Sequence, residues 1–332
     1  AKIMAADLKD TPRAGLRVQL CGDAHLSNFG LFASPERNLL FGLNDFDETL
    51  PGPFEYDVER LAASFVIAAR NNEFTDIQAR EMALAAVTAY REAMAEFAQL
   101  STLEIWYARL SEGMLQRMLS GEGIRKGKKS RRVEKVVQKT AAKARTRDSL
   151  QALSKLGERV DGQYRIVSQP PLVIPLRELE DRYGMSADEV QHALREQLRS
   201  YRSSLQADRR TLLERYEIID AARKVVGVGS VGTRAFIVLL QGRDQQDPLF
   251  LQVKEATRSV LEDHLPKSRF RQPGERVVQG QRMLQAASDI FLGWTKGVQD
   301  NRFLYWRQLR DMKGSAEVET MRPGGMAFYA RA

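Results

Sequence analysis

The sequence predicts an α+β protein in two lobes, a helix-rich lobe over residues 1–216 followed by a small β-rich lobe over residues 217–320. Two observations support this division. Apolar residues recur at helical spacing through much of the first part, whereas from residue 217 short runs rich in Val, Ile, Leu and Phe alternate with Gly, Asp and Pro. The 332 residues, 43% hydrophobic and 28% charged, can bury one large or two ordinary cores. Residues 321–332 are expected to begin a truncated C-terminal segment.

The helix-rich lobe is expected to begin with strands and to continue with helices. Compact apolar runs that stop at Gly, Asp or Asn predict short buried strands, and amphipathic spacing predicts helices, one of them capped by Thr75 or Asp76. Residues from about 101 to 216 are expected to form a helical, basic insertion. The expected strands are 16–21 and 39–43, and the expected helices are 54–70, 75–100, 101–120 and 186–206.

The β-rich lobe is expected to contain five strands and one helix. Three candidate strands lie within residues 216–256, with turns at the glycines and at "GRDQQDP". A helix is expected over 274–288, and "DIFLGWT" and "RFLYWRQL" predict two more short strands. The expected order is strand, Gly-rich turn, strand, strand, helix, strand, strand.

The net charge of +8 comes from one segment. Residues 125–147 hold eleven Lys or Arg against one acid, Glu134, and the rest of the chain sums to −2. This pattern is typical of a solvated helix face or a mobile loop, and it lacks the interleaved aromatic residues of a single-strand binder. Nucleic acid is therefore an unlikely partner, although this segment leaves it open together with an anionic substrate or a membrane surface.

Two further features indicate the cellular compartment. No apolar run approaches the roughly 20 residues that cross a bilayer, so we expect no transmembrane segment. The single cysteine, Cys21, excludes an internal disulfide and a Cys-rich zinc site, as suits a reducing compartment. We expect a cytoplasmic protein.

A glycine-rich stretch lies between two of the expected strands of the second lobe. Gly227, Gly229, Ser230 and Gly232 spell G-x-G-S-x-G, and the β-branched, apolar residues after them predict another strand instead of the helix that a Rossmann fold requires. Backbone N–H groups at such a hairpin can approach phosphate oxygens closely. Lys254 follows on the next strand, where its ammonium could meet the same phosphates, although a surface lysine at a strand edge is the alternative.

Acidic residues follow the first two expected strands. Asp23 is followed five positions later by Asn28, and Asp45 comes at the end of the next strand. Phosphoryl transfer needs a carboxylate that accepts the proton of the attacking hydroxyl, together with oxygen ligands for magnesium. These three residues could supply both roles, although they could also be turn formers at strand ends.

The residues "CGDAHLSN", "NDFDE" and "EYD" resemble the H-G-D-x-H-x-x-N, I-D-[FW]-[DE] and later Asp motifs of aminoglycoside and choline phosphotransferases, which share the protein-kinase-like fold. Over nearly its whole length the chain also resembles the bacterial domain-of-unknown-function family 2252. The resemblance implies ATP and Mg²⁺ as cofactors. It implies that Asp23 is the catalytic base, that Asn28 and Asp45 are metal ligands and that Asp57 supports the catalytic loop.

The same resemblance assigns the nucleotide-binding residues. It implies that Gly227 to Gly232 form the phosphate loop and that Lys254 pairs with the phosphates. It also implies that the segment 306–311 is the hinge beside the adenine, with Gln308 and Leu309 as its binding residues. His25 either lies near the transferred phosphate or packs within the loop, and these roles have equal weight.

Three features depart from the kinase pattern. Cys21 stands where phosphotransferases carry His, and the acidic partner of Lys254 is either Glu262 or Glu275. The Asp and Asn motifs precede the glycine segment, which is the reverse of the order in kinases. The order indicates a circular permutation, or pairing of the two halves between chains.

The expected function is therefore ATP- and Mg²⁺-dependent transfer of a phosphoryl group to a hydroxyl of an unknown, small-molecule acceptor. A nucleotide-binding pseudokinase scaffold and an AMP-transferring enzyme are alternatives. A dinuclear metallophosphoesterase would use Asp23 and His25, but it needs more histidines than His25, His192 and His264.

Overall fold

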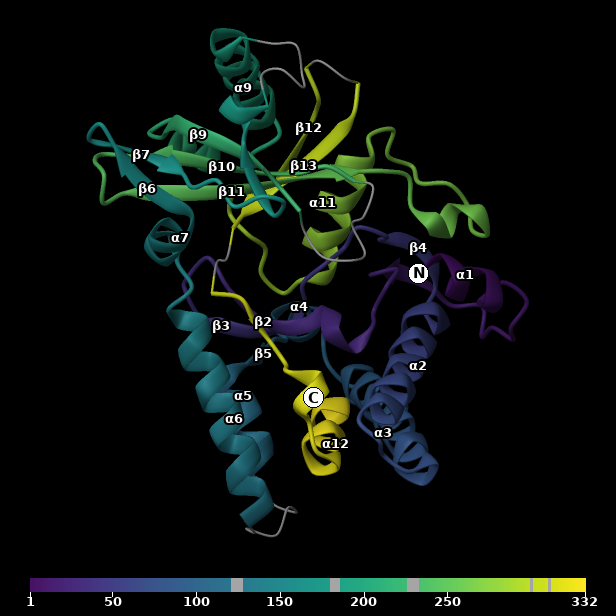
Figure 1. Cartoon of the computed structure of the whole chain (residues 1–332). Coiled ribbons are helices and arrows are strands. Elements are labelled where there is room, and N and C mark those ends of the chain that lie inside the picture. Colours follow the sequence, from purple (N-terminus) through teal and green to yellow (C-terminus); the bar gives the residue numbers. More distant parts are fainter. Residues whose placement is uncertain (121–127, 180–185, 226–232, 299–300, 310–311) are drawn as a thin grey trace.

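The computed structural model of the chain describes residues 1–120, 128–179, 186–225, 233–298, 301–309 and 312–332. It has mixed α and β structure, as expected (Figure 1). The helices are α1 (Lys2–Leu8), α2 (Glu55–Asn71), α3 (Asp76–Phe97), α4 (Thr102–Tyr107), α5 (Glu112–Ser120), α6 (Lys128–Arg145), α7 (Ser149–Leu156), α9 (Ala187–Arg202), α10 (Ala207–Leu213), α11 (Pro273–Leu284) and α12 (Pro323–Arg331).

The strands are β1 (Arg17–Leu20), β2 (Phe29–Ala33), β3 (Leu39–Leu43), β4 (Leu50–Pro53), β5 (Leu110–Ser111), β6 (Gly157–Val160), β7 (Gln163–Ile166), β8 (Val173–Pro175), β9 (Glu217–Lys224), β10 (Ala235–Gln241), β11 (Pro248–Ala256), β12 (Gly293–Lys296), β13 (Phe303–Gln308) and β14 (Gly314–Ser315).

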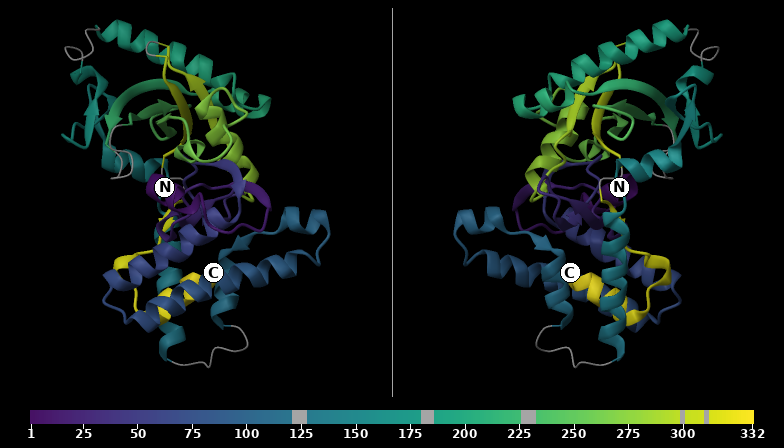
Figure 2. Two further views of the ribbon diagram at one scale, coloured as in Figure 1. Left: turned by 90° about the vertical axis from the view of Figure 1, so that its right-hand side faces the viewer. Right: turned by 90° about the vertical axis from the view of Figure 1, so that its left-hand side faces the viewer.

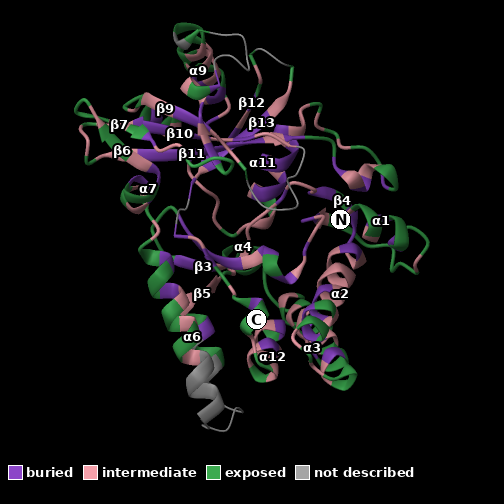
Figure 3. Ribbon diagram, viewed as in Figure 1, coloured by how far each residue is buried: buried purple, intermediate pink, exposed green. Residues whose placement is uncertain are grey.

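The largest sheet has six antiparallel strands in the order β12-β13-β11-β10-β9-β8. β9 and β10 are adjacent and antiparallel, which is the pairing expected of strands that flank a hairpin, although the glycines between them lie outside the described residues. One face of this sheet packs against α9, where the rings of Tyr201 and Trp306 stack with centroids 4.5 Å apart. Figure 3 shows that most of the central strands are buried.

The opposite end of the molecule in Figure 1 contains α2, α3, α6 and α12 around a four-stranded sheet in the order β14-β2-β3-β5. Helix α3 begins with a capping box in which Thr75 and Gln78 satisfy each other's backbone N–H groups. Figure 2 shows α12 beside α3, and Phe65, Met82 and Met326 belong to the core that they share with α2. The basic helix α6 is largely exposed along its described length.

A short ribbon of β1 and β4 connects these two regions, with Leu20 opposite Leu50. The strand expected over 16–21 therefore forms, but it is not buried throughout, because Leu16 and Val18 are 63% and 43% exposed. Strand β2 was not expected. Among the described residues, no helix combines the length and the apolar composition that would be needed to span a bilayer.

The two packed regions do not divide at residue 216, where the boundary between the lobes was expected. β8 belongs to the six-stranded sheet, and Leu198 of α9 lies in the core of that sheet. Conversely, β14 pairs with β2, and α12 packs against α3. The helical segment before residue 216 covers a sheet face that would otherwise expose apolar residues, so it is part of the sheet region and not a separate insertion.

Candidate functional site

The loop that follows β1 depends on a glycine. Gly22 has a φ of +89°, and a Cβ atom on it would lie 2.2 Å from the backbone oxygen of Glu48. Both observations require glycine at this turn. The carboxylate of Asp57, in the first turn of α2, accepts hydrogen bonds from the N–H groups of Cys21 (2.7 Å) and Gly22 (2.9 Å). Burial raises the pKa of Asp57 to about 6, although these two hydrogen bonds act in the opposite direction.

Asn28 connects the two acidic segments through their main chains. Its Nδ2 donates to the backbone oxygens of Asp45 (2.8 Å) and Asp23 (3.3 Å). Its Oδ1 accepts from the N–H groups of Asp45 (2.7 Å) and Asn44 (3.3 Å). Asn28 is only 6% exposed. In this structure the residue expected to be a metal ligand thus positions the segment that carries Asp45.

Four side chains share one face of the six-stranded sheet, and three of them contact the segment 44–47. The register pairs Lys254 with Tyr305 and Gln252 with Arg307 on β11 and β13, so all four side chains share one face. Arg307 donates to Gln252 (3.0 Å) and to the backbone oxygen of Asn44 (3.1 Å). The hydrogen bond from Arg307 to Asn44 thus holds the sheet against the acidic segment.

Lys254 is the central cation of the site. Its Nζ lies 2.5 Å from a carboxylate oxygen of Asp47 and 3.3 Å from both carboxylate oxygens of Asp45, and the residue is 5% exposed. The other oxygen of Asp47 accepts the hydroxyl of Tyr305 at 2.5 Å. Desolvation lowers the pKa of Lys254, but Tyr305, Asp47 and Asp45 outweigh it, so the net change is upward. Lys254 therefore stays charged.

Asp45 remains ionised over the whole ordinary pH range. Desolvation by the surrounding protein raises its pKa, but the positive charges of Lys254, Arg307 and Lys313 outweigh this effect and lower the pKa to about 2. Its side chain is 47% exposed and that of Asp47 39%. Two carboxylates thus reach solvent beside a buried ammonium group.

Asp23 lies on the loop held by Asp57 and Asn28, and its side chain is 31% exposed. The Nε atom of Arg60, on α2, lies 2.6 Å from its carboxylate. Burial lowers the pKa of His25, and Arg60 adds to this effect while the charge of Asp23 opposes it. His25 is therefore mostly neutral at neutral pH.

Arg276 supports the acidic segment from α11. Its guanidinium donates to the backbone oxygens of Thr49 (2.6 Å), Asp47 (2.7 Å) and Thr257 (3.0 Å). Thr257 directly follows β11, so one side chain links the segment that carries Asp47 to the strand that carries Lys254.

A family profile described as "Uncharacterized protein conserved in bacteria (DUF2252)" matches residues 1–332. The chain belongs to this family. No match was found among curated proteins or among solved structures. The expected membership in the DUF2252 family is therefore confirmed.

In this DUF2252 chain, the structure brings together the predicted residues Asp23, His25, Asn28, Asp45, Asp57 and Lys254. The expected partner of Lys254 was wrong. Instead of Glu262 or Glu275, Asp47 and Asp45 pair with this lysine. The predicted phosphate-loop residues, Gly227 to Gly232, lie outside the described part of the chain.

The predicted adenine hinge uses its backbone donors within the protein. The N–H of Gln308 donates to Asp289 at 2.5 Å, and the N–H of Leu309 donates to the backbone oxygen of Phe250 at 2.9 Å. The Leu309 side chain is buried in a cluster with Phe250. Neither N–H is therefore free for a base, and residues 310–311 lie outside the described part of the chain.

From the sequence of this DUF2252 member, four residues were not assigned to this site: Asp47, Arg60, Tyr305 and Arg307, of which Arg307 was placed only in the predicted hinge. Asp47 had a readable signal, because it is the second acid of the "NDFDE" stretch. Tyr305 and Arg307 had none, since only the β11–β13 register places them beside Lys254 and Gln252. Arg60 lies one helical turn after Asp57, on a helix whose orientation the sequence does not give.

Proposed function

We propose that this DUF2252 chain is an ATP- and Mg²⁺-dependent phosphotransferase acting on a hydroxyl of a small molecule. The observation that carries the proposal is the contact of Lys254 with Asp45 and Asp47 across about 200 residues of sequence, beside the loop of Asp23. The two halves of a phosphoryl-transfer site, an ammonium for the phosphates and carboxylates for a metal and a proton, then lie in one place.

The same contact supports a two-lobed, kinase-like arrangement in permuted order. The six-stranded sheet corresponds to the nucleotide-binding lobe, and the region of α2, α3 and α12 corresponds to the catalytic lobe. Both halves of the site belong to one chain, so pairing between chains is not needed to assemble it.

The oxygens available for magnesium differ from those expected. Asn28 Oδ1 already accepts two backbone N–H groups, whereas the carboxylates of Asp45 and Asp47 are partly exposed. Carboxylate oxygens are hard donors, and Mg²⁺ completes its shell with water and phosphate. Among the described residues there is no cluster of three His, Cys, Asp or Glu side chains that could hold a metal without such help. Asp45 and Asp47 are thus the proposed ligands, and the ion would neutralise phosphate charge.

In the proposed reaction the acceptor hydroxyl attacks the γ-phosphorus of ATP. Its proton moves to the carboxylate of Asp23, a P–O bond forms to the acceptor, and the bond to the β-phosphate oxygen breaks to release ADP. Lys254 holds the phosphates, and Arg60 orients the Asp23 carboxylate through its 2.6 Å contact. Asp57 and Asn28 keep the Asp23 loop in position through its main chain.

The test measures Mg²⁺-dependent ATP binding by calorimetry and ADP release with hydroxyl-bearing acceptors. We expect Asp23→Asn to reduce turnover by at least about a hundredfold while nucleotide affinity is retained, because only the proton acceptor is lost. Lys254→Met is expected to weaken nucleotide binding. Asp161→Asn and Lys296→Met are matched controls at exposed positions and should behave as wild type.

The mass of the product distinguishes transfer of phosphate from transfer of AMP. ATP binding without turnover above the Asp23→Asn background would favour the scaffold alternative. No Mg²⁺-dependent binding of ATP, or binding unaffected by Lys254→Met, would contradict the proposed site.

A further inference from the structure

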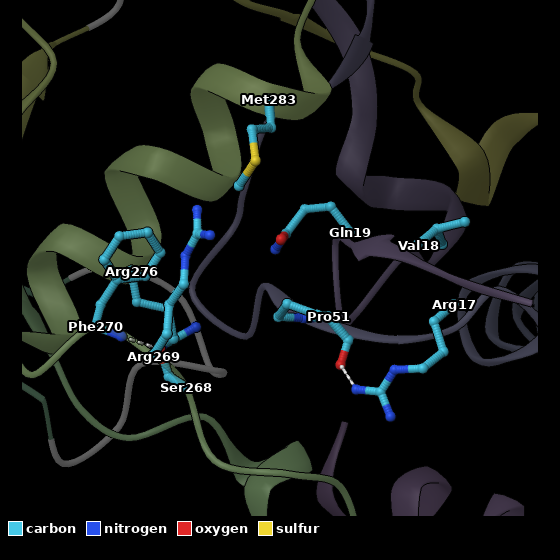
Figure 4. Close-up of a pocket in the computed structure, with 9 residues that line it drawn as sticks. All are labelled: Arg17, Val18, Gln19, Pro51, Ser268, Arg269, Phe270, Arg276 and Met283. Carbon is cyan, nitrogen blue, oxygen red and sulfur yellow. Dashed lines mark hydrogen bonds between the residues drawn. The ribbon is translucent and has the colours of Figure 1, made fainter.

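A hollow lined by arginines lies beside the β1–β4 ribbon, with a volume of about 290 Å³. Figure 4 shows Arg269, Phe270 and Arg276 on one side of it and Arg17 and Gln19 on the other. The volume is at the lower end of the range for small-molecule sites. The hollow is lined by three arginines and no acidic residue.

None of these arginines, Arg17, Arg269 and Arg276, forms an ion pair within the described part of the chain. Arg17 donates to the backbone oxygen of Pro51 at 3.2 Å, and the guanidinium of Arg269 lies 4.9 Å from the ring centre of Phe270. Both arginines keep other donors free to bind a ligand.

Arg276 is the buried member of the group. It is 2% exposed, its hydrogen bonds go to three backbone oxygens, and its Nε has no hydrogen-bond partner among the residues that the structure describes. Glu48, Glu262 and Asp47 act on it electrostatically, but each carboxylate lies beyond ion-pair distance. A buried cation without an adjacent counter-ion is costly, and an anion beside it would offset that cost.

Besides the arginines and the polar residues Gln19 and Ser268, the lining of the hollow is apolar. Val18, Pro51, Phe270 and Met283 line the same hollow, and Val18 and Met283 are 43% and 50% exposed. Guanidinium groups bind phosphates and carboxylates in fixed planar geometry, and the apolar walls suit a hydrocarbon or aromatic body. We propose that this hollow binds a small organic anion, with a phosphate or carboxylate group held by the arginines and an apolar body held against Phe270 and Met283.

This site is separate from the proposed nucleotide site. Both touch the segment 45–49, but through different atoms: the Asp47 carboxylate binds Lys254, whereas the Asp47 backbone oxygen binds Arg276. The inference does not depend on phosphotransferase activity, so either proposal can fail alone.

The test uses phenyl phosphate and phenylacetate as probes in calorimetric titrations of the full chain. We expect at least one probe to bind, and we expect Arg17→Gln and Arg269→Gln each to weaken its affinity about tenfold, because each removes a charge-assisted hydrogen bond. Both residues are exposed, so folding should be retained. Arg271→Gln makes the same change of charge two residues from Arg269 and outside the hollow, and should bind within twofold of wild type.

Two further measurements make the result decisive. Benzyl alcohol, which lacks the charge, should bind at least tenfold more weakly than the bound probe, and Lys254→Met should leave the affinity of that probe unchanged. The probe that binds with the higher affinity identifies the preferred anionic group, phosphate or carboxylate. Absence of binding by both probes, equal binding by benzyl alcohol, or unchanged affinity in Arg17→Gln and Arg269→Gln would overturn the inference. Loss of binding in Lys254→Met alone would place the probe at the proposed nucleotide site and would also overturn it.

Discussion

Asp57 and Asn28 act on the backbone of the site and not on its solvent face. Both carboxylate oxygens of Asp57 accept hydrogen bonds from N–H groups of the Asp23 loop. The side-chain amide of Asn28 joins that loop to the main chain at Asp45. Buried hydrogen bonds of this kind define the positions of neighbouring functional groups more closely than exposed ion pairs do. The positions of Asp23 and Asp45 are therefore coupled at the level of single residues.

The raised pKa of Asp57 leads to a pH-dependent stability. The folded protein holds this proton up to about pH 6, whereas an unfolded aspartate loses it near about pH 4. The folded state thus binds more protons between these values, so the stability from this group is complete below about pH 4 and is lost as the pH rises through about 6. We expect the difference in unfolding free energy between wild type and Asp57→Asn to fall by about 1–3 kcal/mol from pH 4 to pH 7.

Urea denaturation across this pH range measures that difference. The exposed control Asp161→Asn should show a difference from wild type that stays nearly constant. A pH-independent difference for Asp57→Asn would mean that Asp57 titrates in the folded protein as it does in the unfolded one.

At the scale of elements, the turn after β1 controls how the Asp23 loop leaves the strand. Two glycines allow the cost of a positive φ to be distinguished from the cost of a steric clash at the Cβ atom. Gly22 and Gly162 have φ values of +89° and +81°, but a Cβ on Gly22 would meet Glu48, whereas a Cβ on Gly162 would meet nothing within 4 Å. The first site has both constraints and the second has only one.

We expect Gly162→Ala to cost about 1 kcal/mol of stability, the usual cost of a left-handed alanine, and Gly22→Ala to cost at least about 2 kcal/mol more. The additional cost comes from moving the backbone at Glu48, which follows the acidic residues of the site. Chemical denaturation of the two variants tests this expectation. Equal losses would show that the Gly22 turn has room for a side chain.

Most helices and strands were predictable because each is defined by a local pattern. Helix α3 starts at the Thr75 cap, and β9, β10 and β11 follow the expected apolar runs. Strand β2 was not among the expected strands, and it directly follows the polar motif that ends at Asn28. The exposure of Val18 was also not predictable, since four residues of a strand cannot show which face a distant helix will cover.

At the scale of the whole molecule, the two regions are interleaved and do not follow one another along the chain. Tyr201 and Leu205 fill the core beneath the sheet of later strands, and Met326 fills the core between the earlier helices α2 and α3. A cut at residue 216 would therefore remove part of the core from each side.

We expect fragments 1–216 and 217–332, each produced alone, to lack cooperative unfolding, because both lose buried partners. The two fragments mixed together should recover at least part of the native circular dichroism. The full chain is the reference for both measurements. A cooperative thermal transition in fragment 217–332 alone would show that the sheet does not need α9.

The candidate site was predictable as a set of residues and less so as a set of contacts. Motif spacing identified Asp23, Asn28, Asp45 and Lys254, because each follows a strand or lies within one. The partner of Lys254 was not predictable, since Asp47 is 207 residues away and local patterns carry no information on which distant acid will face a strand. The role of Asn28 was missed for a similar reason: its amide oxygen is satisfied by the backbone of another segment.

The sequence separation of Lys254 and Asp45 also defines an interval during protein synthesis in which their contact cannot form. The two residues are 209 positions apart, and ribosomes add roughly 5–20 residues per second, so about 10–40 s pass between their emergence. During this interval the acidic segment has neither its lysine nor the arginine of α11. The nascent chain is also expected to expose Leu20 and Leu50, whose core partners Leu261 and Leu265 come later still, and chaperones and proteases compete for it during this period.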